Sequence, residues 1–200
     1  MAQAKVLNEK EVRKVLLYIA SRKHPTRNRA MFTLLNFTGM RVGELAALRL
    51  CDVLTNDGGI REEIYLSADQ TKGSKGRTVV VSQKGQEEIR NYLQARFKLK
   101  DLLAVTMTDT SRALFTTQKN PSRGFTASTL AQHFHYMYKG AGISGASSHS
   151  SRRGFITNLA NRGVSVRVLM DLAGHRSLAV TQKYIESNPK LARQAVELLS

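Results

Sequence analysis

Apolar residues recur every three or four positions along most of the chain, which is the spacing of one face of an α-helix. The first helix is expected after Asn8, because Glu11 three residues later completes a capping-box pattern. A second covers residues 26–39 and ends at Gly39, which can adopt the left-handed conformation that closes a helix. A shorter helix, VGELAALRL, is expected directly afterwards. The apolar faces of the first two helices hold Val12, Val15, Leu16 and Ile19, then Ala30, Met31, Leu34, Leu35 and Phe37.

One segment has a different pattern. Residues 60–82 contain two runs rich in β-forming residues around a turn of lysine, glycine and serine. Such runs predict a hairpin or small antiparallel sheet. The expected fold class is therefore mainly α with a small antiparallel β-sheet, an α+β domain.

The helical spacing returns after the hairpin and continues to the end of the chain. QKGQEEIRNYLQARF is one expected helix, and TASTLAQHFHYMYKG is another, capped by Thr126 and ended by Gly140. Leu130, Phe134 and Met137 are expected to face inward in the latter helix. Shorter helices are predicted near Ser150, over residues 165–173, at SLAVTQKYI and from Asn188–Pro189.

Composition narrows the class of protein. With 200 residues, 42% hydrophobic content and three prolines, the chain can bury a core, and we expect one domain over residues 1–200. Lysine and arginine number 31 against 15 acidic residues, and the net charge of +16 indicates a polyanionic partner, with nucleic acid leading. Ribosomal and nucleoid proteins share this balance, so charge alone does not separate binding from catalysis.

Cysteine use and hydropathy add exclusions. Cys51 is the only cysteine, so an intramolecular disulfide is excluded, and its apolar neighbours predict a small buried residue. The N-terminus lacks the apolar centre of a secretory signal, and no stretch approaches the roughly 18 apolar residues that a membrane span needs. We expect a cytoplasmic protein without a membrane partner.

Several side chains suit chemistry at a phosphodiester. Cleavage without a metal needs cations on the non-bridging oxygens, a nucleophile in line, and a proton donor for the leaving alkoxide. Arginine binds two oxygens at once and stays charged, lysine can give up a proton, and tyrosine can attack and later leave. The candidates are Arg41, Lys72, His149, Arg152, His175 and Tyr184.

The order and spacing of these six residues resemble the active site of the tyrosine recombinases, also called the phage integrase family. The last four follow one another at 3, 23 and 9 residues, and the resemblance to the catalytic domain extends from about Leu7 to Leu199. It implies double-stranded DNA as the partner, no cofactor and no metal. It also implies that Tyr184 is the nucleophile and forms a 3′-phosphotyrosyl link.

The resemblance assigns a role to each other position. Arg41 and Arg152 would clamp the scissile phosphate, with Glu44 orienting the guanidinium of Arg41. Lys72 would protonate the 5′-hydroxyl leaving group, and Lys75 in the same turn is its rival. His149 would assist proton transfer, and His175 would hydrogen-bond the phosphate.

Other readings of single residues stay open. Tyr136 and Tyr138 are rival nucleophiles, although the register of their helix favours core packing. His133 and His135 could suggest a metal site, but residues two apart on a helix point to different sides, and no matching cysteine or carboxylate follows. Residues 165–184 also fit a helix-turn-helix. Two alternative functions follow, a non-catalytic DNA-binding regulator and a strand transferase similar to type IB topoisomerases.

The two ends of the chain bear on its domain organisation and its assembly. Family members begin with a separate helical domain that clamps DNA, and we expect that domain to be absent here, whether the chain is a piece of a longer recombinase or a short member. The tail could close its own domain or dock on a neighbouring protomer. We expect a monomer in solution and a tetramer on DNA, joined by the tail. Its apolar residues are Leu191, Ala195, Leu198 and Leu199.

Overall fold

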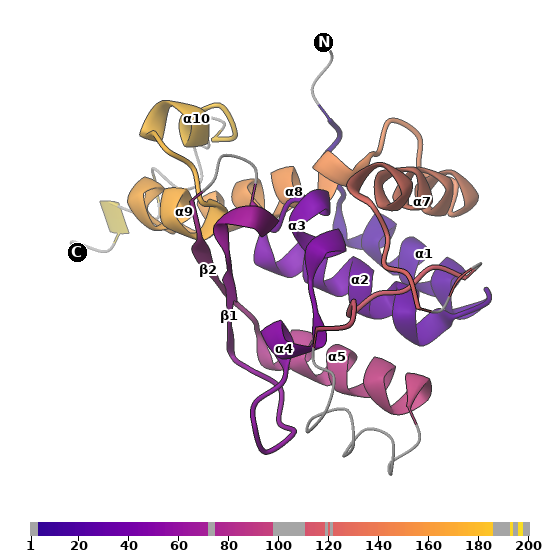
Figure 1. The fold of residues 1–200 in the computed structure, drawn as a ribbon. Helices are drawn as coiled ribbons and strands as arrows, with labels where there is room; N and C mark the ends of the chain where they lie inside the picture. The colour runs from indigo at the N-terminus through magenta and orange to yellow at the C-terminus, as the bar shows by residue number, and fades with distance from the viewer. Residues whose placement is uncertain are drawn as a thin grey trace.

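The computed structural model describes residues 4–71, 75–97, 111–118, 120, 122–185, 193, 196 and 197. Over these residues the fold is mainly helical with a two-stranded antiparallel sheet, which confirms the predicted class (Figure 1). Lys72 and the apolar residues of the predicted tail helix lie outside the described residues. In chain order the elements are α1 (Glu9–Ala20), α2 (Pro25–Thr38), α3 (Val42–Ala47), α4 (Leu50–Val53), β1 (Glu63–Leu66), the 3-10 helix η1 (Ala68–Gln70), β2 (Arg77–Val80), α5 (Gln83–Arg96), α7 (Ala127–Gly140), α8 (Ser148–Ala160), α9 (Val166–Ala173) and α10 (Leu178–Gln182).

Helix α1 begins with the expected capping box. The Asn8 side chain accepts from the Glu11 backbone N–H at 2.9 Å, and the Glu11 carboxylate accepts from the Asn8 N–H at 3.1 Å. Helix α2 ends at Gly39 with φ of 66°. A Cβ at Gly39 would lie 2.6 Å from the Phe155 ring, so glycine both closes α2 and lets α8 approach. This close approach brings Arg41, two residues later, next to α8.

The hairpin packs one face on the core. Strands β1 and β2 pair antiparallel, with Ile64 opposite Val79 and Leu66 opposite Arg77. Ile64, Leu66 and Val79 are buried, whereas the other face is exposed. Because side chains alternate along a strand, Arg77 points to the same inner side as Val79. A charged residue on that side requires polar partners there.

The single helix predicted for VGELAALRL is wrong, because the chain there forms two short helices. Leu48 and Arg49 are extended, and Arg49 forms an isolated β-bridge with Ala113. The Leu48 carbonyl accepts from the Leu114 N–H at 2.8 Å. Pairing with a distant segment therefore replaces the helical hydrogen bonds at this point.

Two burial predictions also fail. Cys51 is exposed, because α4 turns Leu50 and Val53 toward the core and leaves Cys51 on its outer side. Phe37 is 43% exposed, and the Lys84 ammonium lies 5.5 Å from its ring centroid. Both residues sit near the end of a helix, where the apolar spacing no longer decides which side chains are covered.

The buried apolar residues form two clusters of unequal size. The large cluster joins α1, α2, α5, α7 and the inner face of the hairpin. The small cluster lies between α8 and α9, at the end of the molecule where α9 and α10 stand beside the hairpin (Figure 1). Within the described residues, no helix is both long and apolar enough to cross a membrane. The buried members of the small cluster are Ile156, Ala160, Leu169 and Ala173, with Tyr184 and Ile185 packed against them.

Candidate active site

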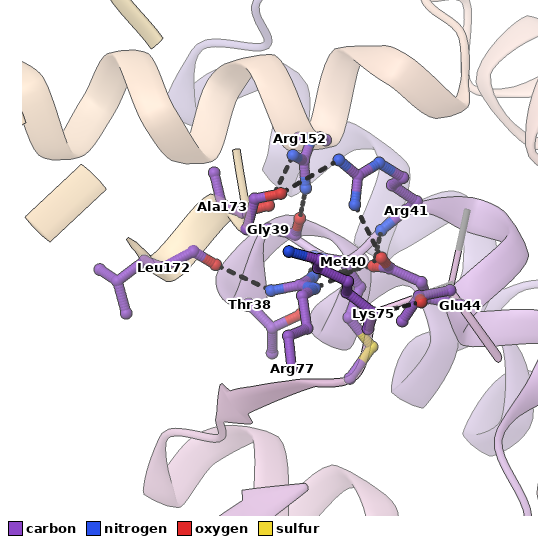
Figure 2. Close-up of polar contacts among 12 residues, drawn as sticks. Thr38, Gly39, Met40, Arg41, Glu44, Lys75, Arg77, Arg152, Leu172 and Ala173 are labelled. Atoms are coloured by element: carbon purple, nitrogen blue, oxygen red, sulfur yellow. Dashed lines mark hydrogen bonds and ion pairs between the residues drawn. The ribbon is translucent and has the colours of Figure 1, made fainter. Parts of the chain in front are cut away.

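Arg41 and Arg152 meet where α2 ends and α8 passes. Arg41 is the N-cap residue of α3, and Arg152 lies on α8. The Arg152 guanidinium donates to the Gly39 carbonyl, and its Nη2 donates to the Ala173 carbonyl at 2.6 Å (Figure 2). Burial, followed by the charges of neighbouring arginines, lowers the pKa of Arg152 to about 10. The guanidinium therefore stays charged at neutral pH while bonded to neutral carbonyls.

Glu44 holds Arg41 in place. Its carboxylate is 1% exposed and accepts from Arg41 Nη1 at 2.8 Å and from the Arg41 backbone N–H at 2.7 Å. Burial alone would raise the pKa of Glu44, but the hydrogen bonds and charge of Arg77 and the bonds from Arg41 hold it below its ordinary value. The carboxylate is thus ionised and fixes one side of the Arg41 guanidinium.

Arg77 is a site residue that the sequence analysis missed. It donates to Glu44 from Nη2 at 2.8 Å and from Nε at 3.3 Å, and from Nη1 to the Leu172 carbonyl at 3.0 Å (Figure 2). One signal could have identified it, because strand alternation from Val79 places a charged residue on the buried face. An inward guanidinium needs a carboxylate, and Glu44 was already a candidate.

The three arginines share the C-terminal end of α9. Its last backbone carbonyls lack helical partners, and the helix dipole makes this end attractive to cations. The acceptors are consecutive: Leu172 for Arg77, Ala173 for Arg152, and Gly174 for Arg41, the last at 3.4 Å. The end of α9 therefore gathers three guanidinium groups immediately before His175.

His175 and Tyr184 follow α9 in the chain and lie together. Their rings stack with centroids 5.7 Å apart and planes at 22°. His175 Nδ1 is 2.9 Å from the buried Thr181 hydroxyl, and the Thr157 hydroxyl donates to the Tyr184 carbonyl at 3.0 Å. Burial and then the neighbouring arginines lower the pKa of His175 to about 4, so the ring is neutral at pH 7.

One cleft of about 600 Å³ brings these groups together. His149, on the first turn of α8, is exposed and also lines it. Among the residues that line the cleft are Arg41, Glu44, His149, Arg152, His175 and Tyr184, which are all the predicted site residues within the described part of the chain.

The predicted lysine, Lys72, lies outside the described residues. Its rival Lys75 is exposed. The Lys75 carbonyl accepts from the Thr71 hydroxyl at 2.7 Å. The choice between the two lysines stays a prediction.

The competing residues have other surroundings. Tyr138 is fully buried and its hydroxyl lies 2.7 Å from that of Ser151, whereas Tyr136 is 59% exposed, so core packing is confirmed for Tyr138 and wrong for Tyr136. His133 Nε2 is hydrogen-bonded to Asn28 Oδ1 at 3.1 Å, and His135 is exposed. No group of three potential metal ligands occurs among the residues that the structure describes.

A family comparison gives this arrangement its context. The model of the phage integrase family matches residues 5–190. This chain belongs to the phage integrase family. The resemblance drawn from the six residues is thereby confirmed at the level of the family.

Individual phage integrase relatives match most of the chain. Tyrosine recombinase XerA of Pyrococcus furiosus is 32% identical over 194 residues, which are 96% of this chain and 61% of that protein. Tyrosine recombinase XerD of Rickettsia prowazekii is 27% identical over 96% of this chain and 61% of its own length. A crystal structure of XerA recombinase superimposes with a TM-score of 0.74 at 26% identity, covering 99% of this chain and 66% of that one. The chain therefore spans about three fifths of the curated relatives' length.

Proposed function

We propose that this domain cleaves and rejoins double-stranded DNA as the catalytic domain of a site-specific recombinase. The observation that carries the proposal is the single cleft lined by Tyr184, two arginines and two histidines. Relatives named tyrosine recombinases match nearly the whole chain, and the net charge of +16 suits a polyanionic substrate.

Arg41 and Arg152 bind the non-bridging oxygens of the scissile phosphate. Each guanidinium already has one side occupied, Arg41 by Glu44 and Arg152 by two backbone carbonyls. Fixed cations of this kind stabilise the charge that develops in the transition state and lose little entropy when the phosphate arrives. Because the hydrogen-bond acceptors of Arg152 within the described residues are neutral carbonyls, its charge is available to the substrate.

Tyr184 supplies the nucleophile. Its phenolic oxygen forms a bond to phosphorus, the bond from phosphorus to the 5′ oxygen breaks, and the 5′ oxygen takes up a proton. His149 assists the removal of the phenolic proton, and Lys72 gives a proton to the leaving oxygen. The phosphotyrosyl bond conserves the energy of the broken ester, so the reverse attack by a 5′-hydroxyl reseals the strand without ATP.

His175 acts as a neutral hydrogen-bond donor. When the Thr181 hydroxyl donates to Nδ1, the ring proton sits on Nε2, which is then free to donate to a phosphate oxygen. The depressed pKa of His175 keeps this tautomer uncharged across the physiological range. Stacking against Tyr184 limits how far the two rings can move apart.

Covalent capture of DNA tests the proposal even though the recognition sequence is not known. A randomised duplex pool with a 5′-bridging phosphorothiolate traps the adduct, because the released 5′-thiol reseals poorly. We expect a protein–DNA band on a denaturing gel with the wild type and with the matched control Tyr136→Phe, and none with Tyr184→Phe. An adduct that survives Tyr184→Phe would move the nucleophile elsewhere, and no adduct from any pool would favour the DNA-binding regulator.

The same substrates identify the proton donor. A thiol leaving group needs no protonation, so loss of the true acid slows cleavage of the ordinary ester and spares the phosphorothiolate. We expect this pattern for Lys72→Ala and not for Lys75→Ala. The reverse result would assign the role to Lys75.

Assembly is a separate part of the proposal. We expect gel filtration to give a monomer for the free protein and a tetramer once a captured site is added. A stable tetramer without DNA would contradict this expectation. Relaxation of supercoiled DNA without strand exchange would favour a type IB topoisomerase activity.

A further inference from the structure

Arg77 lies behind the proposed phosphate clamp. Its side chain is 11% exposed, and it is not among the residues that line the cleft. Its guanidinium donates to Glu44 and to the Leu172 carbonyl, so its three donor nitrogens are directed at the protein interior. Arg77 is therefore placed to act on the site through other residues.

Glu44 is shared by Arg41 and Arg77 in a closed arrangement. Its Oε1 accepts from Arg41 Nη1 at 2.8 Å and Arg77 Nε at 3.3 Å. Its Oε2 accepts from Arg77 Nη2 at 2.8 Å and the Arg41 backbone N–H at 2.7 Å. Without Arg77, each carboxylate oxygen would lose one charged donor, and the carboxylate could rotate about its last bond together with the Arg41 guanidinium.

Gly174 makes the packing of Arg77 against the end of α9 possible. A Cβ there would lie 2.5 Å from Arg77 Cδ and 3.1 Å from its Nε, and the residue has φ of 62°. Arg77 thus packs against the bare backbone of Gly174, the residue that directly precedes His175. Its bond to the Leu172 carbonyl and this packing hold the end of α9 against strand β2.

We propose that Arg77 is a positioning residue that sets the orientation of Arg41 through Glu44 and the place of His175 through the end of α9. The kinetic consequence of this inference rests on the proposed cleavage of DNA. Arg77 itself does not touch the phosphate. Lysine cannot replace it, because a single ammonium lacks the planar fork that reaches both Glu44 oxygens and the Leu172 carbonyl.

The kinetic test separates positioning from DNA binding. Two assays compare the variants Arg77→Met and Arg77→Lys with the exposed control Arg90→Met. The first measures DNA affinity in a Tyr184→Phe background, and the second measures the single-turnover rate of adduct formation at saturating DNA. We expect Arg77→Met and Arg77→Lys to lower the rate on the order of tenfold to a hundredfold, as small misplacements of catalytic groups do. We expect DNA affinity to change by less than about threefold, since no phosphate contact is lost. Arg90→Met should match the wild type in both assays.

A double-variant cycle tests the route through Glu44. If Arg77 acts through Glu44, Arg77→Met combined with Glu44→Gln should slow the reaction no more than the slower single variant does. Gly174→Ala pushes on Arg77 from the opposite side, and we expect it to lower the same rate. Multiplying defects in the double variant would overturn the route through Glu44.

A spectroscopic arm is independent of cleavage. In protein labelled with ¹⁵N-arginine, the Nη signals of Arg41 should be resolved in the wild type and averaged by rotation in Arg77→Lys. A wild type that forms no adduct contradicts the proposed function, while these signals still decide the positioning role. If Arg77→Met does not fold, Arg77→Lys serves in every arm. A wild-type rate together with unchanged Arg41 signals in Arg77→Lys would overturn the inference.

Discussion

Replacing Glu44 by glutamine keeps the shape of the side chain and removes its charge. The wild-type carboxylate accepts from Arg41 Nη1, the Arg41 N–H, and two nitrogens of Arg77. The glutamine amide has one oxygen acceptor, and its NH₂ group must face a guanidinium donor. Breaking a buried ion pair on one side costs about 3–5 kcal/mol. We expect Glu44→Gln to lower the free energy of unfolding by about 3 kcal/mol at neutral pH. This value is at the lower end of that range because Arg41 is 32% exposed and partly screened by water.

The pH dependence distinguishes lost charge from lost packing. The pKa of Glu44 is lower in the folded chain than in the unfolded chain, so its stabilisation is complete above the unfolded value of about 4.3 and disappears as the pH falls through the folded value. The free energies of unfolding of the wild type and Glu44→Gln, measured by urea denaturation, should therefore differ by a constant amount from neutral pH to about pH 5. Below about pH 5 this difference should become smaller. Glutamine has no such titration.

A second buried carboxylate provides the control. Glu88 pairs with Arg29 Nε at 2.6 Å, but Arg29 is 45% exposed, so Glu88→Gln should cost about 1 kcal/mol. Glu88 lies on α5 outside the cleft, and adduct formation should be unchanged in that variant. A loss below about 1 kcal/mol for Glu44→Gln, or a gap that does not narrow in acid, would refute the reasoning.

Three further predictions concern single residues. The NMR shift of His175 should stay flat from neutral pH to about pH 5, because its pKa is held near 4 by burial and then by neighbouring arginines, and a midpoint near the ordinary value of about 6.5 would contradict this. Gly39→Ala should cost about 2 kcal/mol or more in urea denaturation, because φ is positive and the new methyl group meets the Phe155 ring, and a cost below about 0.5 kcal/mol would contradict it. Cys51 should react with a small maleimide in the native protein, slowly at neutral pH, because partial burial and then Asp52 raise the pKa of its thiol. Intact-mass measurement would show the adduct, and labelling only in denaturant would be the opposite result.

The parts of the site that the sequence could predict are those set by local spacing. His149 and Arg152 are three residues apart on one helix, so a helical pattern already places both near one face. Gly39 marks the end of α2, and Arg41 follows at the start of the next helix. These local rules, joined to the family pattern, were enough to name six residues that line one cleft.

The parts that could not be predicted depend on contacts between distant segments. The break between α3 and α4 follows from the pairing of Arg49 with Ala113, which no local pattern indicates. Arg77 required the register of the hairpin and the position of α9, since its partners come from two other parts of the chain. Cys51 was assigned by its apolar neighbours, although its exposure depends on where the short helix α4 begins.

The small apolar cluster between α8 and α9 has a consequence for how relatives of this domain can diverge. Tyr184 packs on Ile156, Ala160, Leu169 and Ala173, whereas Arg41 and Glu44 are anchored beside the large cluster. Exchanges of volume within the small cluster can therefore shift the tyrosine and Arg152 together, because Ala173 is both a member of this cluster and the hydrogen-bond acceptor of Arg152. Under the proposed function, natural variation there would alter the position of the nucleophile and of one arginine of the phosphate clamp in a coupled way.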